Sequence, residues 1–281
     1  MDYKVDVDYK VDVDGFWRDG YTIVKGVYTQ DEIESFRGRA KESAGWNGDL
    51  LSNPKLKDVL TDGRMAAVAR KILGTDEIVY AGDSSYTINS GSHNWHKDNT
   101  DREDPKAPDW TQGRYTMLRF GVYLQDHTRH SGGLNLRRGS HTTTELMAGK
   151  NVYVATAVGD LAVWSMAISH CGTATKLRFP WWIDPEPAMD GKYPRWWIPA
   201  KSAGDRMALF VALGTDDAHH ARYVEYLKTR TYICDMWRRH PWDDETLAEA
   251  SAAGLTVRNV PKEIEGDDTV GQNKWWRAIP Y

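Results

Sequence analysis

The feature that most constrains the fold is a series of short strand-like segments in the middle of the chain, separated by turns rich in Gly, Asp and Ser. Six such segments occupy 77–89, 114–126, 132–141, 151–158, 160–170 and 206–214. Short strands divided by such turns are typical of an antiparallel barrel or sandwich of the jelly-roll kind. The chain therefore predicts a mainly β core.

Helix-like segments flank these strands on both sides. Thr29 is placed to cap the first of them, with acidic residues in the following turn, and Gly74 ends the second. The four segments lie at 29–44, 55–73, 219–240 and 243–253. Because no linker-like composition divides the chain, we expect residues 16–281 to form one domain with N- and C-terminal helices.

The N-terminus contains a tandem repeat. DYKVDV occurs at 2–7 and again at 8–13. The repeat is compatible with an expression tag and with a natural duplication, and its alternation can form a short edge strand. We therefore treat residues 1–15 as a tag-like, disordered or edge segment outside the domain.

The composition excludes several classes of protein. The chain has 281 residues, of which 41% are hydrophobic and 27% charged, as in an ordinary globular protein. Its formal net charge of −4 does not give the basic surface that nucleic acid binding needs. No apolar run is long enough to span a membrane, and the acidic N-terminus is unlike a signal peptide. Two cysteines are too few for a disulfide framework, so we expect a cytoplasmic location; the oligomeric state is left open.

The segment HNWHKDN (93–99) contains the most informative side chains. His96 and Asp98 are two residues apart at the expected end of a strand, where a period of two puts both on one face. An imidazole beside a carboxylate supplies two ligands of the facial triad that holds non-haem iron(II). His170, at the end of a distant predicted strand, is placed to be the third. By itself, a His-x-Asp pair is more often a hydrogen-bonding pair on the surface.

Four segments in order resemble the phytanoyl-CoA dioxygenase family of 2-oxoglutarate oxygenases. They are FWRDGYTIVKGVYTQDEIESFR, NWHKDN, LRFGVYLQDHTRHSGGLNLRRGSH and GDLAVWSMAISHCG, which together cover about residues 16–215. The resemblance implies a double-stranded β-helix (jelly roll, cupin-like) core with flanking helices. It also implies an iron(II) enzyme that uses O2 and converts 2-oxoglutarate to succinate and CO2 while hydroxylating a substrate. Halogenating relatives replace the metal carboxylate with a small residue, so Asp98 favours hydroxylation or a related oxidation.

The resemblance further implies an arginine, beyond the distal histidine, that pairs with the far carboxylate of 2-oxoglutarate. Arg206 fits best because it opens the strand-like run RMALFVALG, although the interval is longer than is usual in the family. Arg178 is nearer in sequence and remains a rival. Thr173 is expected to add a hydroxyl contact to the co-substrate. Tyr86 and Arg119 are weaker candidates on strands expected to line the barrel, and a salt bridge along the strand explains Arg119 equally well.

The longer interval holds FPWWIDPEPAMDGKYPRWWIP (179–199), which has two Trp pairs framed by five prolines. Together with 101–110 it is expected to flank the open side of the metal as a lid that excludes water. A hydrophobic plug or a subunit contact is the alternative. The lid interpretation assigns substrate contacts to Trp110, Trp181, Trp182 and Arg178. Its mixture of aromatic and charged residues favours a polar or amphipathic small molecule as the substrate.

Two other classes of protein compete with the oxygenase hypothesis. A jelly-roll binding protein for a sugar-like or other polar ligand would use the aromatic loops and leave the histidines incidental. A cupin-type hydrolase or isomerase would use a different divalent metal. Loss of a triad residue would favour the first alternative, and independence of 2-oxoglutarate would favour the second.

Overall fold

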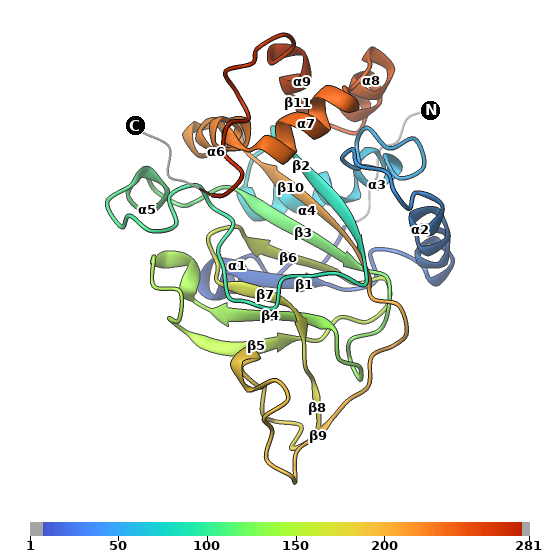
Figure 1. Ribbon diagram of the computed structural model, residues 1–281, viewed down its shortest axis with the longest axis vertical. Helices are drawn as coiled ribbons and strands as arrows, with labels where there is room; N and C mark the ends of the chain where they lie inside the picture. The colour runs from blue at the N-terminus through green and yellow to red at the C-terminus, as the bar shows by residue number, and fades with distance from the viewer. Residues whose placement is uncertain (1–7, 277–281) are drawn as a thin grey trace.

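The computed structural model describes residues 8–276 and contains two packed β-sheets, as the strand pattern predicts (Figure 1). Both sheets are antiparallel except where β11 pairs with β2. The larger sheet has the order β1 (Tyr21–Val24), β6 (Leu161–Ser165), β3 (Leu118–Tyr123), β10 (Met207–Gly214), β2 (Ile78–Ile88) and β11 (Leu255–Val257). The smaller sheet has the order β5 (Lys150–Val154), β4 (Gly133–Arg138) and β7 (His170–Ala174).

Apolar side chains fill the space between the two sheets. Trp164, on the larger sheet, packs edge-on against Phe210 of the same sheet, with 6.2 Å between the ring centroids. Leu134 and Leu136 of the smaller sheet belong to the same buried cluster. Such interdigitation of two inner faces is what holds a β-sandwich together. The strands therefore form a rigid frame for whatever lies at the open end of the sandwich.

Helices cover the other face of the larger sheet and its upper end (Figure 1). The N-terminal group is α1 (Val13–Asp19), α2 (Gln30–Glu42), α3 (Asp58–Thr61) and α4 (Arg64–Leu73), and the C-terminal group is α6 (Ala218–Thr229), α7 (Thr231–Arg239), α8 (Asp244–Ala252) and α9 (Val260–Glu263). Thr29 caps α2 as predicted, since its side chain accepts a hydrogen bond from the Glu32 amide while the Glu32 carboxylate accepts one from the Thr29 amide. No helix in 8–276 is both long and apolar enough to cross a membrane.

Short elements complete the chain between these groups. They are α5 (Pro108–Thr111), the 3₁₀ turns η1 (Ser140–Thr142) and η2 (Pro187–Met189), and the two-stranded hairpin of β8 (Leu177–Phe179) and β9 (Ile198–Pro199). In Figure 1 this hairpin forms the lower tip of the molecule, beyond the smaller sheet.

Three of the predicted elements are each divided in two. The helix expected at 55–73 breaks at Gly63, whose φ of 79° leaves the helical region, and the helix expected at 219–240 breaks at Arg230. The strand expected at 160–170 ends at Ser165, and a turn carries the chain into the other sheet, where His170 begins β7. His170 therefore stands at the start of a strand, not at the end of one.

The described part of the N-terminal repeat lies against the folded chain. Tyr9 is buried, and its carbonyl accepts a hydrogen bond from Lys71. Residues 8–12 form no strand, so the expected edge strand is absent there, and residues 2–7 lie outside the described residues. Because α1 begins at Val13, it crosses the boundary expected at residue 15. That 16–281 is a single domain stays a prediction.

Candidate metal centre

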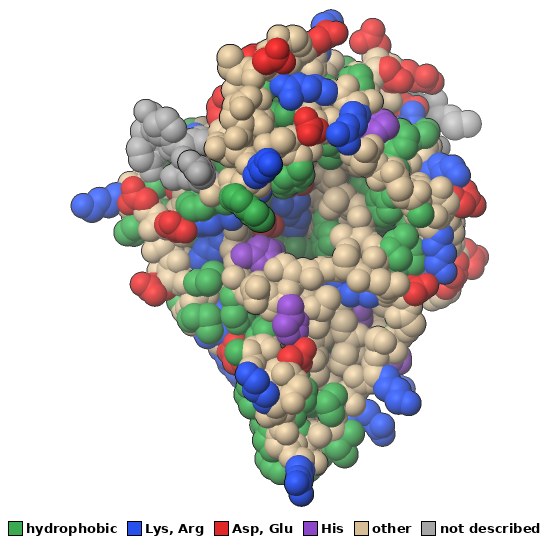
Figure 2. Space-filling model, viewed as in Figure 1, with side chains coloured by type: hydrophobic (Ala, Val, Ile, Leu, Met, Phe, Trp, Pro, Cys, Tyr) green, Lys and Arg blue, Asp and Glu red, His purple; other side chains and the backbone are tan. Residues whose placement is uncertain are grey.

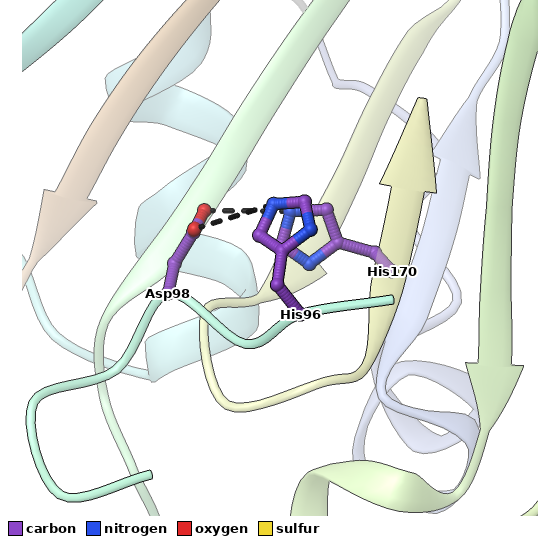
Figure 3. Close-up of side chains that lie close together, drawn as sticks. All are labelled: His96, Asp98 and His170. Carbon is purple, nitrogen blue, oxygen red and sulfur yellow. Dashed lines mark ion pairs between the residues drawn. The ribbon is translucent and has the colours of Figure 1, made fainter. Parts of the chain in front are cut away.

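The side chains of His96, Asp98 and His170 meet at one point (Figure 3). One ligating atom from each lies within 4.8 Å of the other two. The Asp98 carboxylate is 3.8 Å from His96 Nε2 and 3.5 Å from His170 Nε2. The two imidazole rings have centroids 4.2 Å apart. Two imidazoles and one carboxylate on one side of a point leave the opposite positions open, which is the donor set that suits non-haem iron(II).

A short backbone ladder brings these residues together. His96 lies on the loop after β2, yet its amide donates to the His170 carbonyl at 3.0 Å and its carbonyl accepts from the His170 amide at 2.9 Å. The Asp98 amide donates to the Met166 carbonyl at 2.9 Å. The pair therefore does not end a strand, as expected from the sequence, but the extended backbone at this bridge still points both side chains the same way.

Backbone carbonyls orient both imidazoles. His96 Nδ1 is 2.9 Å from the Asn94 carbonyl oxygen, and His170 Nδ1 is 3.1 Å from the Ile168 carbonyl oxygen. A carbonyl oxygen can only accept, so each Nδ1 carries the proton and each Nε2 presents a lone pair to the centre. This is the second-shell arrangement commonly found behind metal-binding histidines.

The electrostatics of the site favour the protonation states that a metal requires. Burial raises the pKa of the Asp98 carboxyl, but interactions with His170 and Arg119 outweigh it, and the net pKa lies below its ordinary value. Burial, followed by repulsion from His96, lowers the pKa of His170 to about 3. At neutral pH, Asp98 is therefore ionised and His170 is neutral, as metal ligands must be.

A buried ion-pair network stands behind the carboxylate. Arg119 Nη2 donates to Asp83 Oδ2 at 2.6 Å and to Asp98 Oδ2 at 3.2 Å, and the Tyr223 hydroxyl donates to Asp83 at 2.6 Å. Arg119 therefore forms a salt bridge, which the sequence analysis gave as the alternative to a contact with 2-oxoglutarate. Sequence reasoning missed Asp83 and Tyr223, because their link to the site runs through Arg119 and not through a motif.

A cavity of about 380 Å³ lies beside the cluster, and His96, Asp98 and His170 form part of its wall. Figure 2 shows this hollow in the centre of the visible face, with Lys or Arg and His side chains around it. Its walls come from both sheets and the C-terminal helices, and besides the three clustered residues they include Asp83, Ser85, Thr87, Gly91, Ser92, Arg102, Arg119, Tyr123, Leu134, Trp164, Gly172, Arg206, Phe210, Tyr223, Tyr226, Leu227, Arg230, Tyr232 and Trp276.

Arg206 lines this cavity from the residue before β10. Its Nε donates to the Gly132 carbonyl at 2.7 Å, and its Nη1 donates to the Ser90 carbonyl. A Cβ atom added at Gly91 or Gly172 would come within 3.2 Å of the guanidinium nitrogens, so these glycines leave room for the group. The guanidinium is thus buried in the cavity wall and held in one orientation.

The other two co-substrate candidates do not line the cavity. Tyr86 points to the opposite face of β2, where its hydroxyl donates to the Ser43 carbonyl, whereas its neighbours Ser85 and Thr87 face the cavity. Thr173 has a φ of 55°, and its hydroxyl lies 2.9 Å from His93 Nδ1. A co-substrate contact from either residue stays a prediction, and this arrangement does not favour it.

The residues of the lid interpretation lie apart from the cavity in this structure, so the lid stays a prediction. Trp181 and Trp182 are 71% and 59% exposed, and the side chain of Arg178 is exposed on β8. Trp110 lies on α5, where its Nε1 donates to the Asp101 carbonyl. None of these four residues lines the cavity. The segment 179–199, which we call the insertion, is held against the smaller sheet by an ion pair between Glu186 and Arg137 of β4 at 2.8 Å.

The C-terminal part of the chain supplies the mouth of the cavity. Tyr226, Arg230 and Tyr232 come from the α6–α7 junction, and Trp276 comes from the segment after α9. Sequence reasoning missed all four. Tyr223, Tyr226 and Leu227 recur at helical spacing, which was a signal of burial. Nothing local in the sequence says what α6 packs against.

Comparisons with known proteins agree with this geometry. No family model matches the chain. The ectoine dioxygenase of Stutzerimonas stutzeri (strain A1501) is 28% identical over 153 residues, which are 46% of this chain and 49% of that protein, so the match spans about half the length of the curated relative.

Solved structures of similar fold include HygX from Streptomyces hygroscopicus with nickel and 2-oxoglutarate bound, at a TM-score of 0.51 and 16% identity over 72% of this chain and 84% of that one. EctD from S. alaskensis, solved with 2-oxoglutarate and 5-hydroxyectoine, has a TM-score of 0.51 and 19% identity over 72% and 74% of the two chains. The 2-oxoglutarate-dependent epimerase SnoN from nogalamycin biosynthesis has a TM-score of 0.51 and 15% identity over 72% and 81%. The chain therefore shares the fold of these solved structures, with the jelly-roll core that the resemblance drawn from its sequence implied.

Proposed function

We propose that this protein is an iron(II)- and 2-oxoglutarate-dependent dioxygenase that oxidises a polar or amphipathic small molecule. The observation that carries the proposal is the meeting of His96, Asp98 and His170 in the wall of one cavity, with both imidazoles oriented by backbone carbonyls as metal ligands are. Similar proteins solved with iron, with nickel and 2-oxoglutarate, or with 2-oxoglutarate bound support the choice of cofactors.

Each group of the cavity has a role in this proposal. His96, Asp98 and His170 hold the metal, and Arg206 binds the far carboxylate of 2-oxoglutarate through its guanidinium fork. When bound together, iron(II), 2-oxoglutarate and O2 supply an oxidation that inserts one oxygen atom into a substrate C–H bond and leaves succinate and CO2. The apolar wall formed by Leu134, Trp164 and Phe210 keeps water away from the reacting centre.

Hydroxylation is the reaction that we propose first, since Asp98 is present and leaves no ligand position for a halide. The ectoine dioxygenase match supports a small-molecule substrate. We also propose a cytoplasmic location, which suits the two buried and unbonded cysteines, Cys171 and Cys234.

Succinate formation tests the proposal. The iron(II)-loaded protein, supplied with 2-oxoglutarate and O2, should produce succinate at a basal rate that rises with substrate. A His170→Ala variant should produce none above the background of free iron. Equal succinate formation by wild type and His170→Ala would refute the proposal, and a metal-dependent reaction that does not need 2-oxoglutarate would favour a hydrolase or isomerase.

A further inference from the structure

The cavity has more positive than negative side chains. Its walls contain four arginines and two aspartates, namely Arg102, Arg119, Arg206, Arg230, Asp83 and Asp98. Both aspartates contact the same arginine, Arg119, so the other three have no carboxylate partner among the lining residues within 8–276. A divalent cation and a dianionic co-substrate add no net charge. The excess of two positive charges on these described residues therefore remains when both are bound, which favours a further anion.

Arg230 is the arginine whose hydrogen-bonding capacity is least used. Its Nε and Nη1 atoms are buried and have no hydrogen-bond partner within residues 8–276. Its guanidinium carbon lies 5.3 Å from the centroid of the Tyr232 ring and 5.8 Å from that of Tyr226. Buried donors without acceptors are rare and costly, so their presence in the wall of a cavity points to an acceptor that arrives with a ligand.

The backbone fixes Arg230 at this place. The residue sits at the break between α6 and α7 with an extended conformation, φ −88° and ψ 119°. The next residue, Thr231, donates its amide to the Asn273 carbonyl at 3.0 Å, which ties the break to the C-terminal segment. That segment also brings Trp276 to the cavity, and Trp276 Nε1 is a second buried donor without a partner in the described chain.

The neighbouring arginines are already committed. Arg206 is held by the Gly132 carbonyl on another wall and is assigned to 2-oxoglutarate in the proposed function. Arg102 donates to the Asn99 carbonyl at 3.0 Å and to the Tyr226 hydroxyl at 3.3 Å. Among the cavity arginines in the described part of the chain, Arg230 is therefore the one free to bind an incoming anionic group.

We propose that Arg230 binds a carboxylate or phosphate group of the small-molecule substrate. The aromatic rings of Tyr226, Tyr232 and Trp276 pack against the adjoining part of that molecule, and its far end reaches the metal centre. This inference rests on the proposed function, because it takes the cavity to be an oxygenase active site. It narrows the substrate class from polar molecules in general to small organic anions.

The experiment measures binding of three probes of similar size to the manganese(II)-loaded protein saturated with 2-oxoglutarate. Phenylacetate and phenyl phosphate carry the anionic group, and phenylacetamide is the neutral counterpart. Calorimetric titrations compare the wild type with Arg230→Met and Arg230→Lys. Arg239→Met is the matched control, because Arg239 is an exposed arginine in the last turn of the adjoining helix.

The wild type and Arg239→Met should bind one of the anions about tenfold or more tightly than the amide, the size expected for a hydrogen-bonded charge pair. The tighter of the two anions distinguishes a carboxylate from a phosphate substrate. Arg230→Met should lose this preference without weakening amide binding, and Arg230→Lys should keep part of it. Equal binding of anion and amide by the wild type, binding of neither anion, or an unchanged preference in Arg230→Met would overturn the proposal.

A separate titration keeps this result distinct from the proposed function. If the manganese(II)-loaded wild type does not bind 2-oxoglutarate, the oxygenase proposal fails. The same probes are then titrated into the metal-free protein, where loss of the anion preference in Arg230→Met still supports the anion site and its retention still contradicts it.

Discussion

Arg119 Nη2 lies 3.2 Å from Asp98 Oδ2 and 2.6 Å from Asp83 Oδ2, so one buried guanidinium is shared between the carboxylate of the candidate metal centre and a second acid. All three residues line the cavity. The arrangement holds Asp98 ionised and turned towards the two histidines before any metal arrives. Arg119 is therefore a positioning residue for the metal carboxylate.

Replacing Arg119 with Met should destabilise the metal-free protein. The change leaves two partly buried carboxylates without their cation, and breaking a buried ion pair in this way typically costs about 3–5 kcal/mol. Urea denaturation measures the free energy of unfolding. Added manganese(II) should recover part of the loss, because the metal provides Asp98 with a new positive partner. A free energy of unfolding within about 0.5 kcal/mol of the wild-type value, with or without metal, would be inconsistent with this role.

Arg206→Lys should raise the 2-oxoglutarate concentration needed for half-maximal succinate formation by about tenfold. An ammonium group cannot reproduce the two parallel hydrogen bonds of a guanidinium fork. Arg178→Lys is the control and should leave this concentration unchanged, since Arg178 is exposed on β8 and does not line the cavity. If the two variants exchange these effects, the assignment of the two arginines is reversed.

Lys97 should make the stability of the protein depend on pH. It is 2% exposed, its Nζ donates to the Ser140 and Ala167 carbonyls, and burial lowers its pKa from 10.5 to about 7. Between those two values the unfolded chain binds more protons at this residue than the folded chain does. The free energy of unfolding should therefore rise as the pH increases through that window.

The matched comparison is Lys97→Met, which keeps the length of the side chain and removes the titrating group. Urea denaturation of both proteins at pH 7, 8 and 9 isolates the Lys97 contribution as the difference between them. That difference should move in favour of the wild type as the pH rises. A difference that is constant across the series would show that Lys97 titrates normally.

Exchanging Trp181 and Trp182 for Ser should leave the kinetics unchanged. Both side chains are largely exposed on the insertion, which is anchored beyond the smaller sheet and away from the cavity. Basal succinate formation and the requirement for 2-oxoglutarate should match the wild type within about twofold, since neither residue contacts the site. A marked rise in uncoupled turnover would support the lid interpretation.

The sequence was sufficient to predict the strands and the three clustered side chains, and the reason is local. His96 and Asp98 are two residues apart on extended backbone, so their side chains share a direction whether or not a strand surrounds them. His170 could be identified because it lies in the last of the four segments that resemble the oxygenase family in order. Gly74 and the Thr29 cap likewise act through neighbours in the chain.

The rest of the site depends on contacts between distant residues. Ser84, Ser85 and Thr87 put polar residues on both faces of the last part of β2, so its sequence does not reveal that Ser85 and Thr87, and not Tyr86, face the cavity. The Trp-rich insertion is held by contacts with distant residues, among them the ion pair of Glu186 with Arg137, 49 positions away, and the hydrogen bond from Trp95 to Glu186. Arg230 reaches the cavity because a helix that its sequence predicts as continuous breaks there.

The most direct test of the central claim follows 2-oxoglutarate binding at the metal without turnover. Under anaerobic conditions, the iron(II)-loaded wild type is titrated with 2-oxoglutarate while the visible charge-transfer absorbance of the iron–2-oxo acid chelate is recorded. We predict a saturable band in the wild type and its loss in Asp98→Ala and His170→Ala variants that retain the native circular dichroism spectrum. A wild type without the band, or variants that keep it, would contradict the assignment of His96, Asp98 and His170 as the metal centre.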